Sequence, residues 1–318
     1  GKNMMTRDKD VRFLFAVFFI FLVYYYVQSI AQKFELNFLI WPKAILDRYE
    51  GSWPLGRSRG PFLHPPLFGQ VMAMLLPVQF YFFYRIRMRL ARFLILVSIV
   101  LSGLGLLYTY TRAPWLAAII GVVVLGIMRQ RYRQLLAAFG VALALAGFLG
   151  LLQAANSDLL QHRLANTTTI GNRLAALSAA LRMWRDNPLF GIGWFNWEHV
   201  YPFYHRGEYF PLFGYVSRYM GKNVVVHDIY WGRLAEEGLI SIALLASATG
   251  VVWMRVRYLW KRVHDADWLN RDGIAAMVGI FAIYAVGGLA IDYRFFDLVN
   301  AIPYLLAGIL VGYQIPEH

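Results

Sequence analysis

The sequence predicts an all-α protein, a polytopic transmembrane helical bundle with a large helical outer loop. Hydrophobic residues make up 59% of the 318 residues, and the mean hydropathy is +0.47. Apolar stretches of roughly 18 residues recur along the chain, close to the length of helix that crosses a hydrocarbon core. A water-soluble helical protein would need polar outer faces on its helices, and few are present. Together these observations indicate a membrane protein.

About eight spans can be drawn from the apolar stretches. They lie near residues 13–31, 63–84, 93–110, 114–128, 135–153, 228–254, 273–291 and 298–313. Spans 114–128 and 298–313 are short for a full crossing, which takes about 20 residues of helix. We expect residues 1–318 to form a single membrane domain.

Lysines and arginines predict how the spans are oriented, because short cytoplasmic loops carry an excess of them. The three basic segments hold Arg85, Arg87, Arg89 and Arg92, then Arg129, Arg131 and Arg133, then Arg255, Arg257, Lys261 and Arg262. The loops around Arg112 and Arg294 hold one arginine each. Both termini are therefore expected in the cytoplasm. The segments expected outside, in the periplasm of a Gram-negative cell, are 32–62, 111–113, 154–227 and 292–297.

The net charge of +13 is spread over many loops, which argues against one nucleic-acid-binding face. The outer loop 154–227 holds seven basic residues and four acidic ones. Long loops escape the charge rule for membrane topology, so topology does not explain this excess. Two interpretations stay open, a solvated basic loop and an electropositive vestibule for phosphate. The chain has no cysteine, so disulfides and thiolate metal sites are excluded.

An amphipathic helix is predicted over residues 171–185 of the outer loop. Its expected apolar face comprises Leu174, Leu177, Leu181 and Trp184. Arg173 lies at the edge of that face and forms an R-x3-L pattern with Leu177. From there its guanidinium could bind an anionic ligand or extend to lipid headgroups. The pattern by itself is not specific.

His227 stands just before the span that begins near residue 228, in an H-x10-G spacing with Gly238. A neutral imidazole can take a proton from a hydroxyl near pH 7, given its reference pKa of about 6.5. The alternative is an interfacial histidine in an aromatic belt with Tyr230 and Trp231. If His227 is not a base, the remaining candidates on this stretch are Asp228, Glu236 and Glu237.

Two further arginines lie at expected outer ends of spans. Arg59 precedes the second span in a Gly- and Pro-rich segment, and Arg112 lies between the third and fourth spans. An arginine held in so short a loop is expected to pair with an anionic group. Asp265 and Asp267 form a D-x-D pair on the expected cytoplasmic side, which we interpret as a solvated loop. No histidine pair has zinc-ligand spacing, so no metal or cofactor is expected.

The chain resembles the superfamily of O-antigen ligases and Wzy-type O-antigen polymerases, and it is most similar to the ligases. The matching stretches are RGPFLHPPLFGQ at 59–70, TYTRAPWLA at 109–117, GNRLAALSAALRMWRDNPLFGIG at 171–193 and VHDIYWGRLAEEGLI at 226–240. Their order and the large outer loop also agree, and the resemblance covers most of residues 11–313. Two features depart from the family, which typically has about twelve spans and an Asn-Pro-Asn-like segment where this chain has HPP at 64–66. We therefore expect either a shortened member or part of a longer protein.

The resemblance implies a GT-C-like, metal-independent, inverting glycosyltransferase. Its donor would be an undecaprenyl-diphosphate-linked glycan, and its active site would face the periplasm from the inner membrane. By position, Arg173 and His227 match the catalytic arginine and histidine of the ligase outer loop. Arg59 and Arg112 match arginines of its other outer motifs, so that Arg59, Arg112 and Arg173 would bind the diphosphate.

Three acceptors remain open at this stage. For a ligase the acceptor is lipid A-core, for a polymerase another lipid-linked repeat unit, and for an oligosaccharyltransferase a protein hydroxyl. A transporter or flippase of lipid-linked glycans is the alternative from another class. It would bind diphosphate through the same arginines but would not need His227 to titrate. The ligase is the first hypothesis, and no nucleic acid is expected as a partner.

Overall fold

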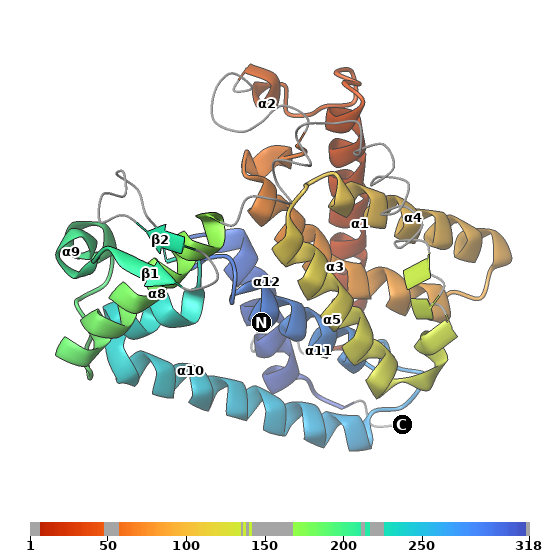
Figure 1. Cartoon of the computed structure of the whole chain (residues 1–318). Coiled ribbons are helices and arrows are strands. Elements are labelled where there is room, and N and C mark those ends of the chain that lie inside the picture. The colour runs from red at the N-terminus through yellow and green to blue at the C-terminus, as the bar shows by residue number, and fades with distance from the viewer. Residues whose placement is uncertain are drawn as a thin grey trace. The chain divides into compact units, whose positions relative to one another are not determined.

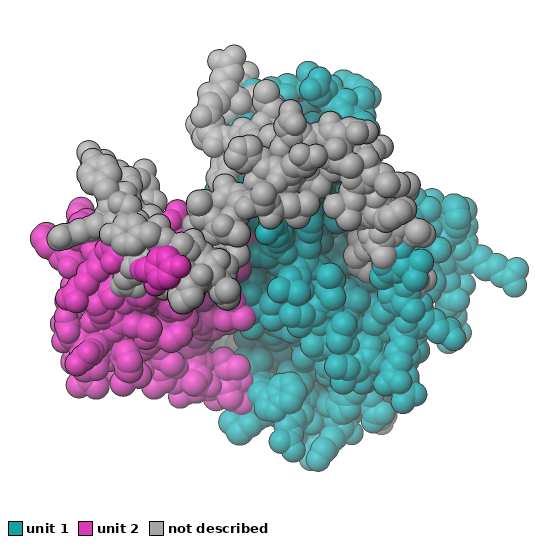
Figure 2. Space-filling view, viewed as in Figure 1, with its two compact units in different colours: residues 1–146, 252–287, 296–318 teal, residues 147–251, 288–295 magenta. Residues whose placement is uncertain are grey.

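The computed structural model describes residues 7–47, 57–134, 136–137, 140–141, 168–210, 214–216 and 226–315. The chain divides into two compact units, shown in different colours in Figure 2. Unit 1 comprises residues 1–146, 252–287 and 296–318, and unit 2 comprises residues 147–251 and 288–295. We describe each unit by itself.

Unit 1 holds most of the long helices. They are α1 (Asp8–Lys33), α3 (Pro65–Arg85), α4 (Arg89–Leu107), α5 (Arg112–Met128), α11 (Arg271–Gly287) and α12 (Asp297–Gly312). The short elements are α2 (Ala44–Asp47) and the 3-10 turns η1 (Gly60–Phe62) and η2 (Gln130–Tyr132). All the helices are labelled in Figure 1.

Unit 2 contains helices and a small hairpin. It contains α8 (Thr168–Asp186), α9 (Trp197–Tyr204), β1 (Glu208–Phe210) and β2 (Gly214–Val216), and most of α10 (Ile229–Arg262), whose last residues belong to unit 1. The two strands pair antiparallel, with Tyr209 opposite Tyr215. This hairpin was not predicted, but three-residue strands leave the fold all-α in character.

The predicted fold class, a helical membrane protein, is confirmed. In the described part of the chain, α1, α3, α4 and α10 are long and apolar enough to cross a membrane, and α5 and α12 are shorter apolar helices. The shortness of α5 and α12 agrees with the sequence prediction. Helix α11 ends at Gly287, four residues before the predicted end of its span. Most of the predicted span 135–153 lies outside the described residues.

Helix α3 is the centre of unit 1 and packs against α1, α4, α5 and α11. Polar side chains join these helices inside the bundle: Gln70 Nε2 donates to the carbonyl of Ile283 at 3.0 Å, and Ser29 Oγ donates to that of Gly105 at 2.7 Å. A Cβ at Gly121 would lie 2.2 Å from Cγ1 of Ile283, so glycine is needed for the close approach of α5 and α11. Small residues and buried hydrogen bonds are typical of helix contacts in membranes.

Segments expected on the cytoplasmic side meet at one end of unit 1. Asp8 Oδ1 accepts the backbone N–H of Trp268 at 2.6 Å and the hydroxyl of Tyr313 at 3.2 Å. The D-x-D loop lies here, and Asp267 is buried, accepting the N–H of His264 at 3.2 Å. Its interpretation as a solvated loop is therefore wrong for Asp267, because this carboxylate closes a turn inside the protein.

Candidate active site

Helix α10 is broken at Gly238, where φ is 69° and ψ is −167°. The helix begins at Ile229, as predicted, and the break makes residues 229–237 a separate helical segment. The break frees the carbonyls of Ala235 and Glu236, which accept the N–H groups of Ile192 and Gly193, both at 2.9 Å. In the other direction Leu239 donates its N–H to Pro188, also at 2.9 Å.

The glycines at this junction allow backbone to touch backbone. A Cβ at Gly238 would lie 2.2 Å from the carbonyl oxygen of Leu189, and a Cβ at Gly191 would lie 2.4 Å from the carbonyl carbon of Glu236. Both glycines also have positive φ, which other residues rarely adopt. The segment from Asn187 to Gly193 is thus bound to α10 at the end of the H-x10-G region.

Helix α8 packs in unit 2 through a face of small side chains. Its buried residues include Ala175, Ala176, Ala179, Ala180 and Met183. All of these except Ala175 belong to one cluster with Trp197, Tyr201 and Ala235. The predicted leucine face is not the packing face, and Leu181 is 38% exposed. Alanines allow the helix backbone to approach its neighbours closely, so the small residues pack inward. Arg173 remains exposed near the start of the helix.

Arg173 and His227 lie close enough in unit 2 to interact electrostatically. The pKa of His227 is lowered, first by partial desolvation of the ring and then by the positive charge of Arg173, while Asp292 acts in the opposite direction. The imidazole still presents surface to solvent, in a bend with φ of 56° just before α10. A neutral imidazole beside an exposed guanidinium can accept a proton from a bound hydroxyl.

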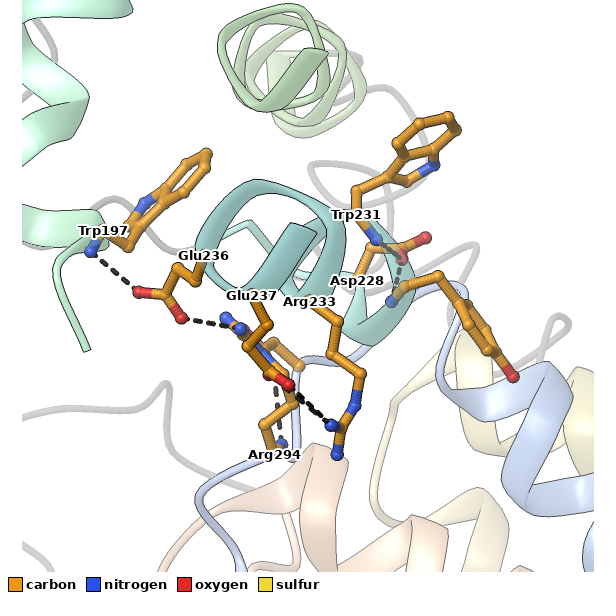
Figure 3. Close-up of polar contacts among 9 residues, drawn as sticks. Trp197, Asp228, Trp231, Arg233, Glu236, Glu237 and Arg294 are labelled. Carbon is orange, nitrogen blue, oxygen red and sulfur yellow. Dashed lines mark hydrogen bonds and ion pairs between the residues drawn. The ribbon is translucent and has the colours of Figure 1, made fainter. Parts of the chain in front are cut away.

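Asp228 caps the first segment of α10. Its Oδ1 accepts the N–H of Tyr230 at 2.8 Å and the N–H of Trp231 at 3.0 Å, as Figure 3 shows. These N–H groups have no partner within the helix, so the carboxylate satisfies them. Burial raises the pKa of Asp228, and these two hydrogen bonds oppose that rise. Asp228 thus acts on the helix end that carries His227.

Arg294 is the site residue that sequence reasoning missed. Its Nη1 lies 2.7 Å from Oε2 of Glu236, and its Nη2 lies 2.9 Å from Oδ2 of Asp292. The other oxygen of Glu236 accepts the N–H of Trp197 at 2.8 Å (Figure 3). Asp292, the counter-charge that acts on His227, is therefore held by a buried arginine. We had interpreted Arg294 only as a charge in a short outer loop.

The remaining carboxylate on this stretch also has a partner. Glu237 pairs with Arg233 four residues earlier, with Nη1 of Arg233 3.1 Å from Oε2 of Glu237 (Figure 3). Each of the three alternative bases, Asp228, Glu236 and Glu237, therefore accepts from a defined donor. Because these three carboxylates are already engaged, His227 is the better candidate for the base.

Arg59 and Arg112 belong to unit 1, where their segments lie side by side. Ser58 donates its N–H to the carbonyl of Tyr108 at 2.9 Å, and Arg57 Nη2 donates to Thr111 Oγ1 at 2.7 Å. Two details differ from expectation. Arg59 is buried, and Arg112 is the exposed first residue of α5 instead of part of a loop. Because a cation is unfavourable at a helix N-terminus, helix stability does not explain Arg112.

These observations define a helical membrane protein in which an arginine and a histidine of unit 2 interact electrostatically. Residues 97–246, from α4 into α10, match the sequence profile of the O-antigen ligase family. The match confirms the resemblance and includes Arg112, Arg173 and His227. No curated protein sequence matches the chain. The family supports glycan transfer of the ligase or polymerase type, from a lipid-linked glycan to a lipid acceptor.

Proposed function

We propose that this protein is an O-antigen ligase of lipopolysaccharide biosynthesis. It transfers an undecaprenyl-diphosphate-linked glycan to lipid A-core at the periplasmic face of the inner membrane, without a metal ion and with inversion at the anomeric carbon. The observation that supports this most directly is the juxtaposition of Arg173 and His227 within the segment that matches the family.

In this proposal His227 is the general base. The acceptor hydroxyl loses its proton to the imidazole while its oxygen bonds to the anomeric carbon, and the bond from that carbon to the diphosphate oxygen breaks. A single displacement of this kind inverts the configuration. The lowered pKa of His227 supports the assignment, because the ring is then neutral near pH 7.

The arginines bind the leaving group. The departing lipid diphosphate takes the electron pair, and Arg173, Arg59 and Arg112 are proposed to stabilise its charge. Charge-assisted hydrogen bonds of this type contribute about 1.5–3 kcal/mol each. Because an anionic diphosphate needs charge stabilisation more than protonation, the reaction requires no acid to assist its departure. Among the described residues, no three His, Asp or Glu side chains group as metal ligands.

The alternatives differ in the acceptor or in the need for a base. A Wzy-type polymerase or a protein O-oligosaccharyltransferase would use the same donor chemistry with another lipid-linked repeat unit or a protein hydroxyl. A transporter or flippase would bind the diphosphate without proton transfer. The lowered pKa of His227, to which the charge of Arg173 contributes, favours transfer over transport.

Two measurements on one purified preparation test the proposal. His227→Ala should bind the lipid-linked donor normally and lose single-turnover transfer to lipid A-core by about 10²–10⁴, the usual range for removing a general base. His199→Ala, at an exposed position on α9, is the matched control and should transfer normally. Intact binding with a near-wild-type rate in His227→Ala would reduce this histidine to a structural role.

The acceptor and the metal are tested in the same assay. Lipid A-core, a lipid-linked repeat unit and an acceptor protein should be compared, and only the first should be extended efficiently. Turnover should survive EDTA. Complete loss of activity in EDTA that magnesium or manganese restores would contradict the metal-independent mechanism.

A further inference from the structure

Four exposed apolar side chains meet where the broken helix α10 begins its long apolar segment. Leu189 and Phe190 are 56% and 73% exposed, and Leu239 and Ile240 are each 42% exposed. Their backbones are joined, because Leu239 donates to Pro188 at 2.9 Å and Ile240 to Leu189 at 3.4 Å. We call these four residues, all in unit 2, the entry patch.

The composition of α10 indicates where the entry patch lies relative to the hydrocarbon core of the membrane. Residues 238–254 carry no charged side chain. The most apolar 18-residue stretch of this helix has a mean hydropathy of 1.8. Only 6% of this stretch is buried inside the protein, so its apolar surface is available to lipid. The Arg233–Glu237 pair lies directly before the break. Leu239 and Ile240 thus lie where the helix enters hydrocarbon.

The turn from Asn187 to Phe190 must lie at the same depth. It is fastened to the first residues of the apolar segment by backbone hydrogen bonds on both sides of Gly238. Gly191 and Gly238 allow this close backbone approach, because neither has a Cβ that would clash. Phe190 therefore sits beside the start of a membrane span and exposes most of its ring. Water is an unfavourable surrounding for such a ring.

We propose that Leu189 and Phe190 insert among lipid acyl chains at the outer edge of the bilayer and form a wedge that seats unit 2 on the membrane. The occupant is lipid, because the patch is continuous with the lipid-facing surface of α10. The wedge follows α8, which carries Arg173, and is bonded to the segment that begins at His227. It therefore holds the candidate site next to the surface where a lipid-linked substrate lies.

The absence of cysteine allows a direct test of depth. Three single-cysteine variants, Phe190→Cys, Leu244→Cys and Glu198→Cys, would each be labelled with a nitroxide. The labelled proteins would be reconstituted into phosphatidylethanolamine–phosphatidylglycerol vesicles. Leu244 is an exposed position within the apolar segment, and Glu198 is an exposed charged position on α9. The label at 190 should collide readily with oxygen and poorly with the water-soluble nickel complex NiEDDA, as at 244. The label at 198 should show the reverse.

Two outcomes would overturn the wedge. Nickel accessibility at 190 equal to that at 198 would place the turn in water. Low accessibility to both oxygen and nickel would mean that protein, either a partner or a second copy, covers the patch. A label at Leu189→Cys repeats the measurement in case the substitution at Phe190 disturbs folding. This readout does not depend on transfer activity, so it can fail while the proposed function stands.

Discussion

Arg294 and Glu236 form a buried ion pair, with Nη1 of the arginine 2.7 Å from Oε2 of the glutamate and both side chains at most 2% exposed. Asp292 binds the same guanidinium through two further contacts of 2.9 Å. Because Glu236 also accepts the N–H of Trp197, one arginine links the 288–295 loop, the first segment of α10 and the start of α9. The loop contributes Asp292, one of the two charges that act on His227.

Removing this arginine should destabilise unit 2 severely. Arg294→Ala would leave Glu236 and Asp292 buried without their counter-charge, and breaking a buried pair typically costs about 3–5 kcal/mol. Arg233→Ala is the matched control, because it removes an arginine–glutamate pair from the same helix whose side chains are 19% and 20% exposed. That more exposed pair should contribute about 0–1 kcal/mol. Denaturant unfolding in detergent compares the two, and equal small losses would contradict a structural role for Arg294.

The break in α10 provides a second stability test. Gly238→Ala would force alanine into a positive-φ conformation and place its Cβ 2.2 Å from the carbonyl oxygen of Leu189. Strain of this kind costs about 1–3 kcal/mol before the clash is counted. Gly250→Ala, in the same helix with nothing within 4 Å of its added Cβ, should change the free energy of unfolding by less than about 1 kcal/mol. Similar unfolding midpoints for the two variants would mean that the break is not needed for the fold.

The membrane-spanning helices could be predicted because hydropathy is local. Seven of the eight predicted spans correspond to described helices, with ends displaced by up to eight residues, as at Arg262 for α10. The break at Gly238 could not be predicted in this way. An isolated glycine is tolerated within a helix, and the partner that requires the break, residues 188–193, lies almost fifty positions earlier. The H-x10-G spacing singled out Gly238 but did not indicate that the helix breaks there.

The candidate site was predicted only in part, for a similar reason. Arg173 and His227 belong to recognisable stretches, and they lie close together. Arg294 lies in no recognisable stretch. Its role depends on burial between the carboxylates of Glu236 and Asp292, which are far apart in sequence. The packing face of α8 could not be predicted from hydrophobicity, which identifies only the apolar leucine face. The tight packing selects Ala176 and Ala180 instead.

Transfer should depend on the shape of the Arg173 guanidinium and not only on its charge. Arg173→Lys should reduce kcat/KM for the lipid-linked donor nearly as much as Arg173→Ala, since an ammonium cannot make the paired contacts of a planar fork. Arg185→Lys, at an exposed position near the end of the same helix, should leave transfer almost unchanged. Near-normal turnover in Arg173→Lys would show that two-point recognition of the diphosphate is wrong at this position.

The pH dependence of transfer should report on the surroundings of His227. A base is active when neutral, so kcat/KM should rise with pH through the pKa of the free enzyme's imidazole. Desolvation and the charge of Arg173 lower that pKa, so the midpoint of the ascending limb should lie below the reference value of about 6.5. His227→Ala should lose this limb altogether.

Two charge variants should move that midpoint in opposite directions. Arg173→Gln removes a positive charge that disfavours imidazolium, so the pKa of His227 should rise and the limb should move to higher pH. Asp292→Asn removes a negative charge that favours imidazolium, so the limb should move to lower pH. Arg173→Lys keeps the charge and should leave the midpoint in place while lowering the rate. The comparison uses midpoints and not amplitudes, which separates it from any loss of folded protein. If the Gln and Asn variants shift the limb the same way, or neither shifts it, the titrating base is a group other than His227.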